Sequence, residues 1–285
     1  IFLQVLDHQK YQNMSDQNRI RLIATEPIRG RIIDKNGEVL ANSKLNYSLV
    51  VKPQIINQKI WDEYKYKLAK LLKVDVDKLD RKYNNFNIGN QNFYIKLSDY
   101  LSIEQLIRFK ENERYFKGVE IAEKVVRNYP YKTLAAHALG YTSPVTDLEF
   151  NTLSKKGYRL NDLIGRTGVE HAYEDYLRGQ WGGEMIEVDA SGNYQKSLGV
   201  KPSKKGKDIK LTIDLNLQKV AEEVLLDKKG GALIAMDPRD GAIRAIASKP
   251  TFDLNFFSRE FKPEKEYNEL FFSKKKPLFN RALNA

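Results

Sequence analysis

Short apolar runs separated by turn signals predict strands near the start of the chain. "RGRIIDKNGEVLANS" is typical of two strands, at 31–33 and 38–40, joined through Asn36 and Gly37. That dipeptide tolerates the positive φ of a tight hairpin. "YSLVVKP" predicts a further strand, and "EMIEVDASGNYQ" predicts a second hairpin.

Apolar residues three to four positions apart predict helices further along the chain. The second of these helices follows the capping box formed by Ser102 and Gln105. Both helices are expected to pack against a core. Their apolar faces consist of Ile60, Trp61, Tyr64, Leu68, Leu71 and Leu72 in the first, and Ile103, Leu106 and Ile107 in the second.

The segment "TGVEHAYEDYLRG" predicts the best-defined helix of the chain. Thr167 and Glu170 have the spacing of a capping box at its start, and Gly179 ends it. One stripe of this helix is expected to lie in a core, and its members are Val169, Ala172, Tyr173, Tyr176 and Leu177.

The first residues, 1–25, carry alternating charge without a turn signal before Pro27, which predicts a helical stalk. They begin with "IFLQVL", an apolar hexamer far shorter than the roughly 20 residues that a membrane-spanning helix needs. Both an amphipathic helix start and the end of a membrane anchor are compatible with this hexamer.

A basic stretch punctuated by Pro and Gly, "KPSKKGKD", is the best candidate for a domain boundary. After it the pattern predicts a strand at 209–213, a helix capped by Asp214 and a hairpin turned at 238–241. The residues that follow the boundary are few for a separate core, so they predict the opening of a larger domain. Its helix is expected to direct inward Leu217, Val220, Val224 and Leu225.

Composition narrows the possible functions without choosing among them. The 285 residues favour two domains, and a hydrophobic fraction of 41% is enough for real cores. A net charge of +11 favours anionic partners such as nucleic acid, lipid headgroups or acidic polymers. The chain contains no cysteine, which excludes disulfides, thiolate metal sites and cysteine nucleophiles.

Ser273 and Lys276 have the spacing of the serine acyltransferase motif Ser-x-x-Lys. That motif requires a serine at the start of a helix and a desolvated lysine one turn away. Lys276 precedes Pro277, which disfavours the α region, and two further lysines adjoin it. We therefore interpret the pair as a chance occurrence.

Other candidate chemistry is weak. Gly37 is misplaced for a calcium loop beginning at Asp34, and the three histidines lack metal-ligand spacing, so we expect no metal. Glu174 with Asp175, and Glu222 with Glu223, are interpreted as solvated charges. No phosphate-binding glycine loop is present, so no cofactor is expected, and lysine clusters without interleaved aromatics are poor evidence for nucleic-acid binding.

Six segments matter more as an ordered set than any of them does alone. They are "NRIRLIATEPIRGRIIDKNGEVLANSKLNYSLVV", "YPYKTLAAHALGY", "LIGRTGVEHAYEDYLRGQWGGEMIEVDASG", "LTIDLNLQKVAEEVL", "GALIAMDPRDGAIRAIASKPTFDLNFF" and "PLFNRALNA". Together and in this order they resemble a class B penicillin-binding protein of the elongation-specific type. The resemblance covers nearly the whole chain. The turn in "YPYKTL" departs from it, because relatives often carry glycine there.

The resemblance implies an α+β chain in three parts. Residues 1–25 are the membrane-proximal stalk, 26–205 the pedestal or dimerisation domain, and 206–285 the opening of an incomplete transpeptidase domain of the serine β-lactamase-like fold. It also implies a single-pass anchor in the bacterial inner membrane, with the domains outside the cytoplasm.

The implied activity is peptidoglycan D,D-transpeptidation during cell-wall elongation, through an acyl-serine intermediate. The family's nucleophilic helix would follow the segment that resembles "RALNA", so Ser273 lies upstream of it and no residue of this chain is expected to be catalytic. Implied partners are peptidoglycan stem peptides, a glycosyltransferase of the shape, elongation, division and sporulation type and, for the full-length protein only, β-lactams. Nucleic acid is not among them.

Seven residues match the pedestal motifs, either as structural residues or as contacts with the glycosyltransferase. They are Arg29, Gly30, Asp34, Gly37, Arg166, Gly168 and Glu170. The structural roles expected are turns for glycine, helix capping for Glu170 and ion pairs for the arginines. The main alternative for the protein is a non-catalytic pedestal that binds and regulates a glycosyltransferase.

Overall fold

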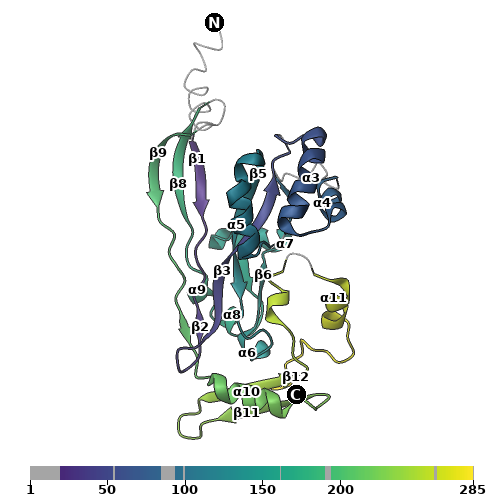
Figure 1. Ribbon diagram of the computed structural model, residues 1–285. Helices are drawn as coiled ribbons and strands as arrows, with labels where there is room; N and C mark the ends of the chain where they lie inside the picture. Colours follow the sequence, from purple (N-terminus) through teal and green to yellow (C-terminus); the bar gives the residue numbers. More distant parts are fainter. Residues whose placement is uncertain are drawn as a thin grey trace. The chain divides into compact units, whose positions relative to one another are not determined.

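The computed structural model describes residues 20–53, 55–84, 94–98, 100–160, 162–189, 194–259 and 262–284 (Figure 1). The chain contains both helices and antiparallel and parallel strands, as expected for an α+β protein. It forms two compact units, the first made of 1–43, 127–258 and 264–285 and the second of 44–126 and 259–263. Each unit is described by itself.

A three-stranded antiparallel sheet in the first unit contains β1 (Ile20–Thr25), β8 (Gly182–Val188) and β9 (Tyr194–Lys201), in the order β1-β8-β9. The hairpin predicted at "EMIEVDASGNYQ" is thus confirmed. The helical stalk is wrong for 20–25, because these residues pair with β8 from Ile20↔Glu187 to Thr25↔Gly182. Its other residues, 1–19, lie outside the described residues.

The hairpin predicted at Asn36 and Gly37 is present. It joins β2 (Ile32–Ile33) to β3 (Val39–Val51), and Gly37 has the positive φ of +98° that the turn requires. The strand expected in "YSLVVKP" is the continuation of β3. On its other side β2 pairs in parallel with β10 (Ile209–Lys210).

The predicted linker at 201–208 is not a loose connection. Gly206 donates its N–H to Ile28 O at 2.9 Å, and Lys207 donates to Tyr176 O at 2.7 Å. A bridge between Gln180 and Lys204 adds two further backbone hydrogen bonds. The proline, glycine and lysine residues indicate a break in regular structure here. They do not reveal that main-chain groups from distant parts of the sequence form hydrogen bonds with the backbone of this segment.

The opening of the region after 208 follows the predicted order of strand, helix and hairpin. Helix α10 (Leu215–Val224) begins at the N-cap Asp214, and β11 (Gly231–Met236) pairs antiparallel with β12 (Ile243–Lys249). The other elements of the unit are α6 (Ala136–Leu139), β6 (Thr142–Pro144), α7 (Asp147–Leu153), η2 (Ser154–Lys156), β7 (Leu163–Gly165), α8 (Gly168–Ala172), α9 (Glu174–Leu177), η3 (Leu254–Phe256) and α11 (Glu264–Phe271).

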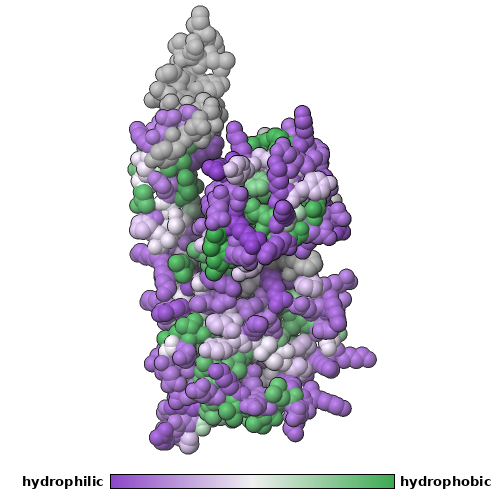
Figure 2. Space-filling view, viewed as in Figure 1, coloured by the Kyte–Doolittle hydropathy of each residue, from purple (hydrophilic) through white to green (hydrophobic). Residues whose placement is uncertain are grey.

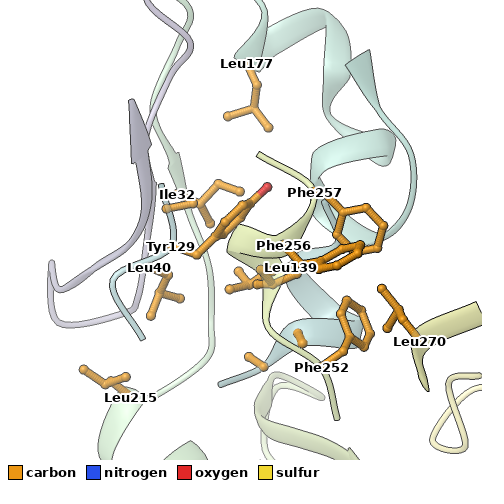
Figure 3. Packing of buried hydrophobic residues seen from close by; sticks show 14 residues of the cluster. Ile32, Leu40, Tyr129, Leu139, Leu177, Leu215, Phe252, Phe256, Phe257 and Leu270 are labelled. Carbon is orange, nitrogen blue, oxygen red and sulfur yellow. The ribbon is translucent and has the colours of Figure 1, made fainter. Parts of the chain in front are cut away.

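The main core of the first unit gathers side chains that are remote in the sequence. Figure 3 shows Ile32 and Leu40 of the hairpin, Tyr129 and Leu139 converging on the aromatic rings that follow β12. All of these are buried, so their apolar surface is removed from water on folding. The aromatic contributors are Phe252, Phe256 and Phe257.

The second unit contains the helices predicted around Trp61 and after Ser102. They are α3 (Gln58–Leu72) and α5 (Ile103–Asn112), and the capping box of Ser102 with Gln105 is confirmed. Trp61, Leu68 and Leu72 are fully buried in its core. The other elements are α4 (Val76–Asn84), β4 (Ile95–Lys96), η1 (Glu113–Tyr115) and β5 (Val119–Asn128), which pairs with β3.

Two predicted helix faces are wrong. In α5, Ile103 and Ile107 are exposed and Phe109 is the buried residue. In α10, the buried residues include Gln218 and Ala221, and Ala221 packs with Leu225 against the small side chains of β12. Three of the four residues expected inward are therefore exposed, and Figure 2 shows hydrophobic surface at the level of α10. They are Leu217, Val220 and Val224.

Candidate functional site

The fully buried carboxylate of Glu170 binds two arginines at once. Arg29 Nε donates to Glu170 Oε2 at 2.7 Å, and Arg127 Nε donates to Glu170 Oε1 at 2.7 Å. Arg29 precedes β2, Arg127 lies near the end of β5 and Glu170 lies on α8. One side chain thus joins three segments that are far apart in the sequence.

A second carboxylate, that of Glu174 on α9, completes the arrangement. Arg29 Nη2 donates to Glu174 Oε2 at 2.6 Å, and the backbone N–H of Gly165 donates to the same oxygen at 2.9 Å. Tyr158 Oη donates to Glu174 Oε1 at 3.0 Å. We name Arg29, Arg127, Glu170 and Glu174 the buried charge cluster.

The buried charge cluster is balanced, with two positive and two negative side chains. Backbone carbonyls take further donors, since Arg127 Nη1 donates to Gly30 O at 2.7 Å and Arg29 Nη2 to Glu170 O at 3.0 Å. Charges removed from water are tolerated when they are paired and hydrogen-bonded. The cluster therefore depends on all four members being present.

The electrostatics of the cluster oppose ionisation of its tyrosines. Burial, and then the charge of Glu170, raise the pKa of Tyr129. Burial, and then Glu174, raise the pKa of Tyr158 to about 12. Burial alone would lower the pKa of Arg29, but attraction to Glu170 and Glu174 raises it instead. Arg29 therefore stays charged, and the phenols of Tyr129 and Tyr158 stay neutral, at neutral pH.

Asp34 connects the β2–β3 hairpin to the start of α10. Its Oδ1 accepts the N–H groups of Asn36 at 2.7 Å and Glu38 at 2.8 Å, and its Oδ2 accepts that of Leu215 at 3.0 Å. Burial disfavours the charged form, but these backbone hydrogen bonds prevail and lower the pKa of Asp34. The same carboxylate shapes the turn and satisfies a helix N-terminus.

Arg166 clamps the segment before α7. Its guanidinium forms a bidentate ion pair with Glu149. It also donates from Nε to Ser143 Oγ at 2.6 Å and from Nη2 to Pro144 O at 2.8 Å. The hydrogen bonds from Arg166 are the main reason why the pKa of Glu149 falls to about 2. The expected ion pairs of Arg29 and Arg166 are thus both present.

Two motif glycines allow a close approach of main chain. A Cβ on Gly30 would lie 1.9 Å from Lys207 O, and one on Gly168 would lie 2.5 Å from Ala138 O. Gly168 also has a positive φ of +58°. Only glycine avoids both problems, which explains these positions structurally.

The capping role expected for Glu170 is wrong. Thr167 makes no side-chain capping bond, and α8 and α9 are separate helices that meet at Tyr173, not one helix. Tyr173 and Tyr176 of the expected core stripe are exposed, while Leu177 is fully buried. The ion pairs of Glu170 with two buried arginines contribute more free energy than a capping hydrogen bond at the surface, which is worth about 1 kcal/mol.

Two carboxylates that were interpreted as solvated are not. Glu174 is buried in the cluster, and Glu222 accepts the N–H of Ala135 at 2.6 Å and an amide N–H of Gln218 at 2.9 Å. Burial raises the pKa of Glu222. Spacing along α10 relates Gln218 to Glu222, but it could not show the partners that come from outside the helix, which are Ala135 for Glu222 and Arg29 for Glu174.

Ser273 and Lys276 do not form a nucleophile with its base. Ser273 follows the end of α11 instead of starting a helix, and Lys276 has a left-handed φ of +46°. Ser273 Oγ accepts the N–H of Lys275 at 3.2 Å. Among the residues that the structure describes, no group of three or more His, Asp or Glu side chains could hold a metal ion.

Sequence reasoning missed Arg127, Glu174 and Tyr158 as members of this site. A signal was available for Arg127, which stands within the apolar and basic stretch "KVVRNYP" that enters the core at Tyr129. For Glu174, the helical spacing predicted an acidic residue next to the core stripe, but it gave no information on which residue would bind its carboxylate. Burial leaves Arg29, Asp34 and Glu170 little surface to offer to another protein.

A hairpin, two short helices and a buried charge cluster tie distant segments together, and this arrangement defines a scaffold domain. The profile of the penicillin-binding protein dimerisation domain matches residues 24–211, and the chain belongs to this family.

Curated relatives extend the match across the rest of the chain. A protein of Acinetobacter baumannii named peptidoglycan D,D-transpeptidase MrdA is 35% identical over 283 residues, which is 99% of this chain and 41% of the relative. The Escherichia coli K12 protein of that name is 34% identical over 98% of this chain and 44% of its own length. The chain thus spans less than half of these relatives.

Solved structures agree with the fold. PBP2 of Helicobacter pylori, in a complex with MreC, has a TM-score of 0.74 and 25% identity, covering 92% of this chain and 48% of that one. A chain of a peptidoglycan synthase complex described as coordinating polymerisation and crosslinking has a TM-score of 0.70 and 27% identity, over 98% and 48%. No helix in the described part of this chain is both long and apolar enough to cross a membrane.

Proposed function

We propose that this chain is part of a peptidoglycan D,D-transpeptidase of the elongation-specific penicillin-binding type. The observation that carries the proposal is the 35% identity to a protein of that name over 99% of the chain, which includes residues outside the family profile. In such an enzyme a serine outside residues 1–285 would attack the substrate carbonyl and form an acyl intermediate. The 285 residues would themselves supply no nucleophile.

The proposed division of labour follows the predicted boundaries. Residues 26–205 act as the pedestal, 206–285 open the transpeptidase domain, and an anchor upstream of the stalk at 1–25 holds the protein at the outer face of the inner membrane. The contacts of Asp34 with Leu215, and of Gly206 with Ile28, support a pedestal that fixes the start of the next domain. Stem peptides are the proposed substrate.

A glycosyltransferase is the proposed partner of the pedestal. A structural neighbour from a synthase complex that coordinates polymerisation with crosslinking favours this proposal. Because most members of the buried charge cluster are inaccessible, we propose that they act by shaping the pedestal. The partially exposed motif residues Arg166, Gly37 and Gly168 remain candidates for direct contact.

The test is covalent labelling of the full-length protein by a fluorescent penicillin. We expect the wild type and the Ser273→Ala variant to be labelled at the same rate, because Ser273 lies in a turn after α11. The 285-residue chain alone should not be labelled. Loss of labelling in Ser273→Ala, with the fold intact, would contradict the assignment, and an unlabelled full-length wild type would favour a non-catalytic pedestal that binds a glycosyltransferase.

A further inference from the structure

Residues 275–282 form a turn that is held by the side chain of Arg281, and we name it the Arg281 turn. Its guanidinium donates to three backbone carbonyls, those of Lys275 at 2.8 Å, Lys276 at 3.2 Å and Phe279 at 3.3 Å. A planar guanidinium with five donors can hold several acceptors in fixed directions. The side chain of Arg281 therefore closes this turn by holding the carbonyls of Lys275, Lys276 and Phe279 together.

Two contacts fasten the Arg281 turn to other elements of the same unit. The N–H of Arg281 donates to Ser248 Oγ of β12 at 2.9 Å. On the other side, His137 Nε2 lies 2.7 Å from Pro277 O. Because a carbonyl oxygen can only accept, Nε2 of His137 carries the hydrogen and donates it.

The imidazole of His137 is held in place by its surroundings. Its ring meets that of Phe252 edge to face, with centroids 5.1 Å apart and planes at 83°. Burial lowers the pKa of His137, the carbonyl of Pro277 acts in the opposite direction, and the charge of Arg281 lowers it further. A neutral ring with one hydrogen on Nε2 satisfies this contact at neutral pH.

The hydrogen bond between His137 and Pro277 connects two different regions of the sequence. His137 lies on α6, inside the region that matches the dimerisation-domain family, whereas Pro277 lies outside it. The hydrogen bond thus joins the two regions at a point 140 residues apart in the sequence. It acts on the segment "PLFNRALNA", the last matched segment of the chain.

We propose that His137 is a positioning residue, which sets the path of residues 277–284 by fixing Pro277 and the Arg281 turn, and thereby affects the acylation rate of the full-length protein. This inference rests on the proposed transpeptidase function. In this proposal His137 acts through the main chain of residues 277–284 and not as a catalytic residue. A misplacement of about 1 Å in a reacting group can slow a reaction by roughly 100-fold, so a single hydrogen bond at this place has a measurable effect.

The experiment uses the full-length protein with His137→Ala and His137→Gln. We measure the second-order rate of acylation by a fluorescent penicillin, and amide hydrogen exchange in residues 278–284. We expect His137→Ala to acylate at least about tenfold more slowly and to exchange faster in that segment. The Nε2 amide of glutamine can also donate to Pro277 O, so His137→Gln should recover part of the rate.

The matched control is His171→Ala. It also removes a histidine whose ring nitrogen bonds a backbone carbonyl, that of Gly165 at 3.0 Å, but it does not touch the Arg281 turn. We expect His171→Ala to be acylated at the wild-type rate.

Arg281→Lys serves as a second test variant. An ammonium group cannot bind three carbonyls in the directions that the guanidinium does, so this variant should slow acylation as His137→Ala does.

The outcomes separate the two proposals. A full-length wild type that is not acylated overturns the transpeptidase function, and the positioning role with it. If the wild type is acylated and His137→Ala reacts equally fast, only the positioning role is overturned. A fall in melting temperature with an unchanged acylation rate would give His137 a purely structural role and would likewise overturn it.

Discussion

At the scale of single residues, the charged side chains of the buried cluster determine how the first unit is held together. Glu170 has no exposed surface, yet each of its carboxylate oxygens meets an arginine at 2.7 Å. A helix cap could be replaced at small cost, but an arginine left without its counter-ion in this interior could not. The motif residues Arg29 and Glu170 are thus explained by each other.

We expect Glu170→Gln to lower the free energy of unfolding by about 3–5 kcal/mol, because it leaves two buried arginines facing one carboxylate. The measurement is urea unfolding followed by circular dichroism. The control is Glu63→Gln, which removes the exposed partner of Lys67 on α3 and should cost no more than about 1 kcal/mol. Equal effects of the two variants would show that the buried pairs contribute no more than surface ones.

At the scale of elements, neighbouring residues decided where helix α10 begins, and contacts from outside the helix decided which face is buried. Helix α10 is capped from within by Asp214, whose Oδ1 accepts the N–H groups of Asn216 at 2.9 Å and Leu217 at 3.2 Å. The predicted cap was confirmed, because capping depends on residues next to the helix in sequence. The predicted inward face of α10 was wrong, because it depends on β12.

The Asp214 cap gives a prediction for pH dependence. The ion pair with Lys35, at 2.9 Å, is the main cause that lowers the pKa of Asp214 from 3.8 to about 2. A carboxyl whose pKa is lowered on folding adds stability above its unfolded pKa, and this stability is lost as the pH falls through the folded value.

We therefore compare wild type with Asp214→Asn, in which an amide oxygen still accepts the capping hydrogen bonds but carries no charge. The stability advantage of the wild type should stay constant above about pH 5 and shrink between about pH 4 and pH 2. Thermal unfolding at a series of pH values measures it. An advantage that persists unchanged at pH 2 would mean that the Lys35 pair does not stabilise the folded state.

At the scale of the whole molecule, contacts of residues 30–33 connect β2 to the segment that follows the predicted pedestal. Strand β2 pairs in parallel with β10. Arg31 donates three hydrogen bonds to Asp208, one from its backbone N–H at 2.8 Å and two from its guanidinium at 2.9 and 2.7 Å. Gly30 lies directly against this segment. The stretch that composition indicates as a linker is thus part of one compact unit.

Gly30→Ala tests this connection, because its Cβ would meet Lys207 O at 1.9 Å and backbone would have to move. We expect a loss of about 1–3 kcal/mol or more in unfolding free energy, as for an overpacked interior. Gly199→Ala in β9 is the control, since nothing lies within 4 Å of its Cβ, and it should stay within about 0.5 kcal/mol of wild type. A tolerated Gly30→Ala would show that β2 and β10 separate easily.

Features with a local cause were determined by the sequence alone. The Asn36–Gly37 turn, the Ser102 capping box, the Asp214 cap and the hairpins all rest on residues a few positions apart, and the structure has them. The ordered set of motifs likewise identified the family without any structure. Ser273 could be rejected as a nucleophile because Pro277 restricts the backbone of Lys276, the lysine of the motif.

Only the tertiary structure decided which distant residues meet. The partners of Glu170 come from positions 141 and 43 residues away, and β1 becomes a strand because β8 satisfies its backbone. The exposed apolar residues of α10 follow from packing through Ala221. The physical reason is common to all three, because burial and pairing energies between remote segments exceed the local preferences that a sequence pattern records.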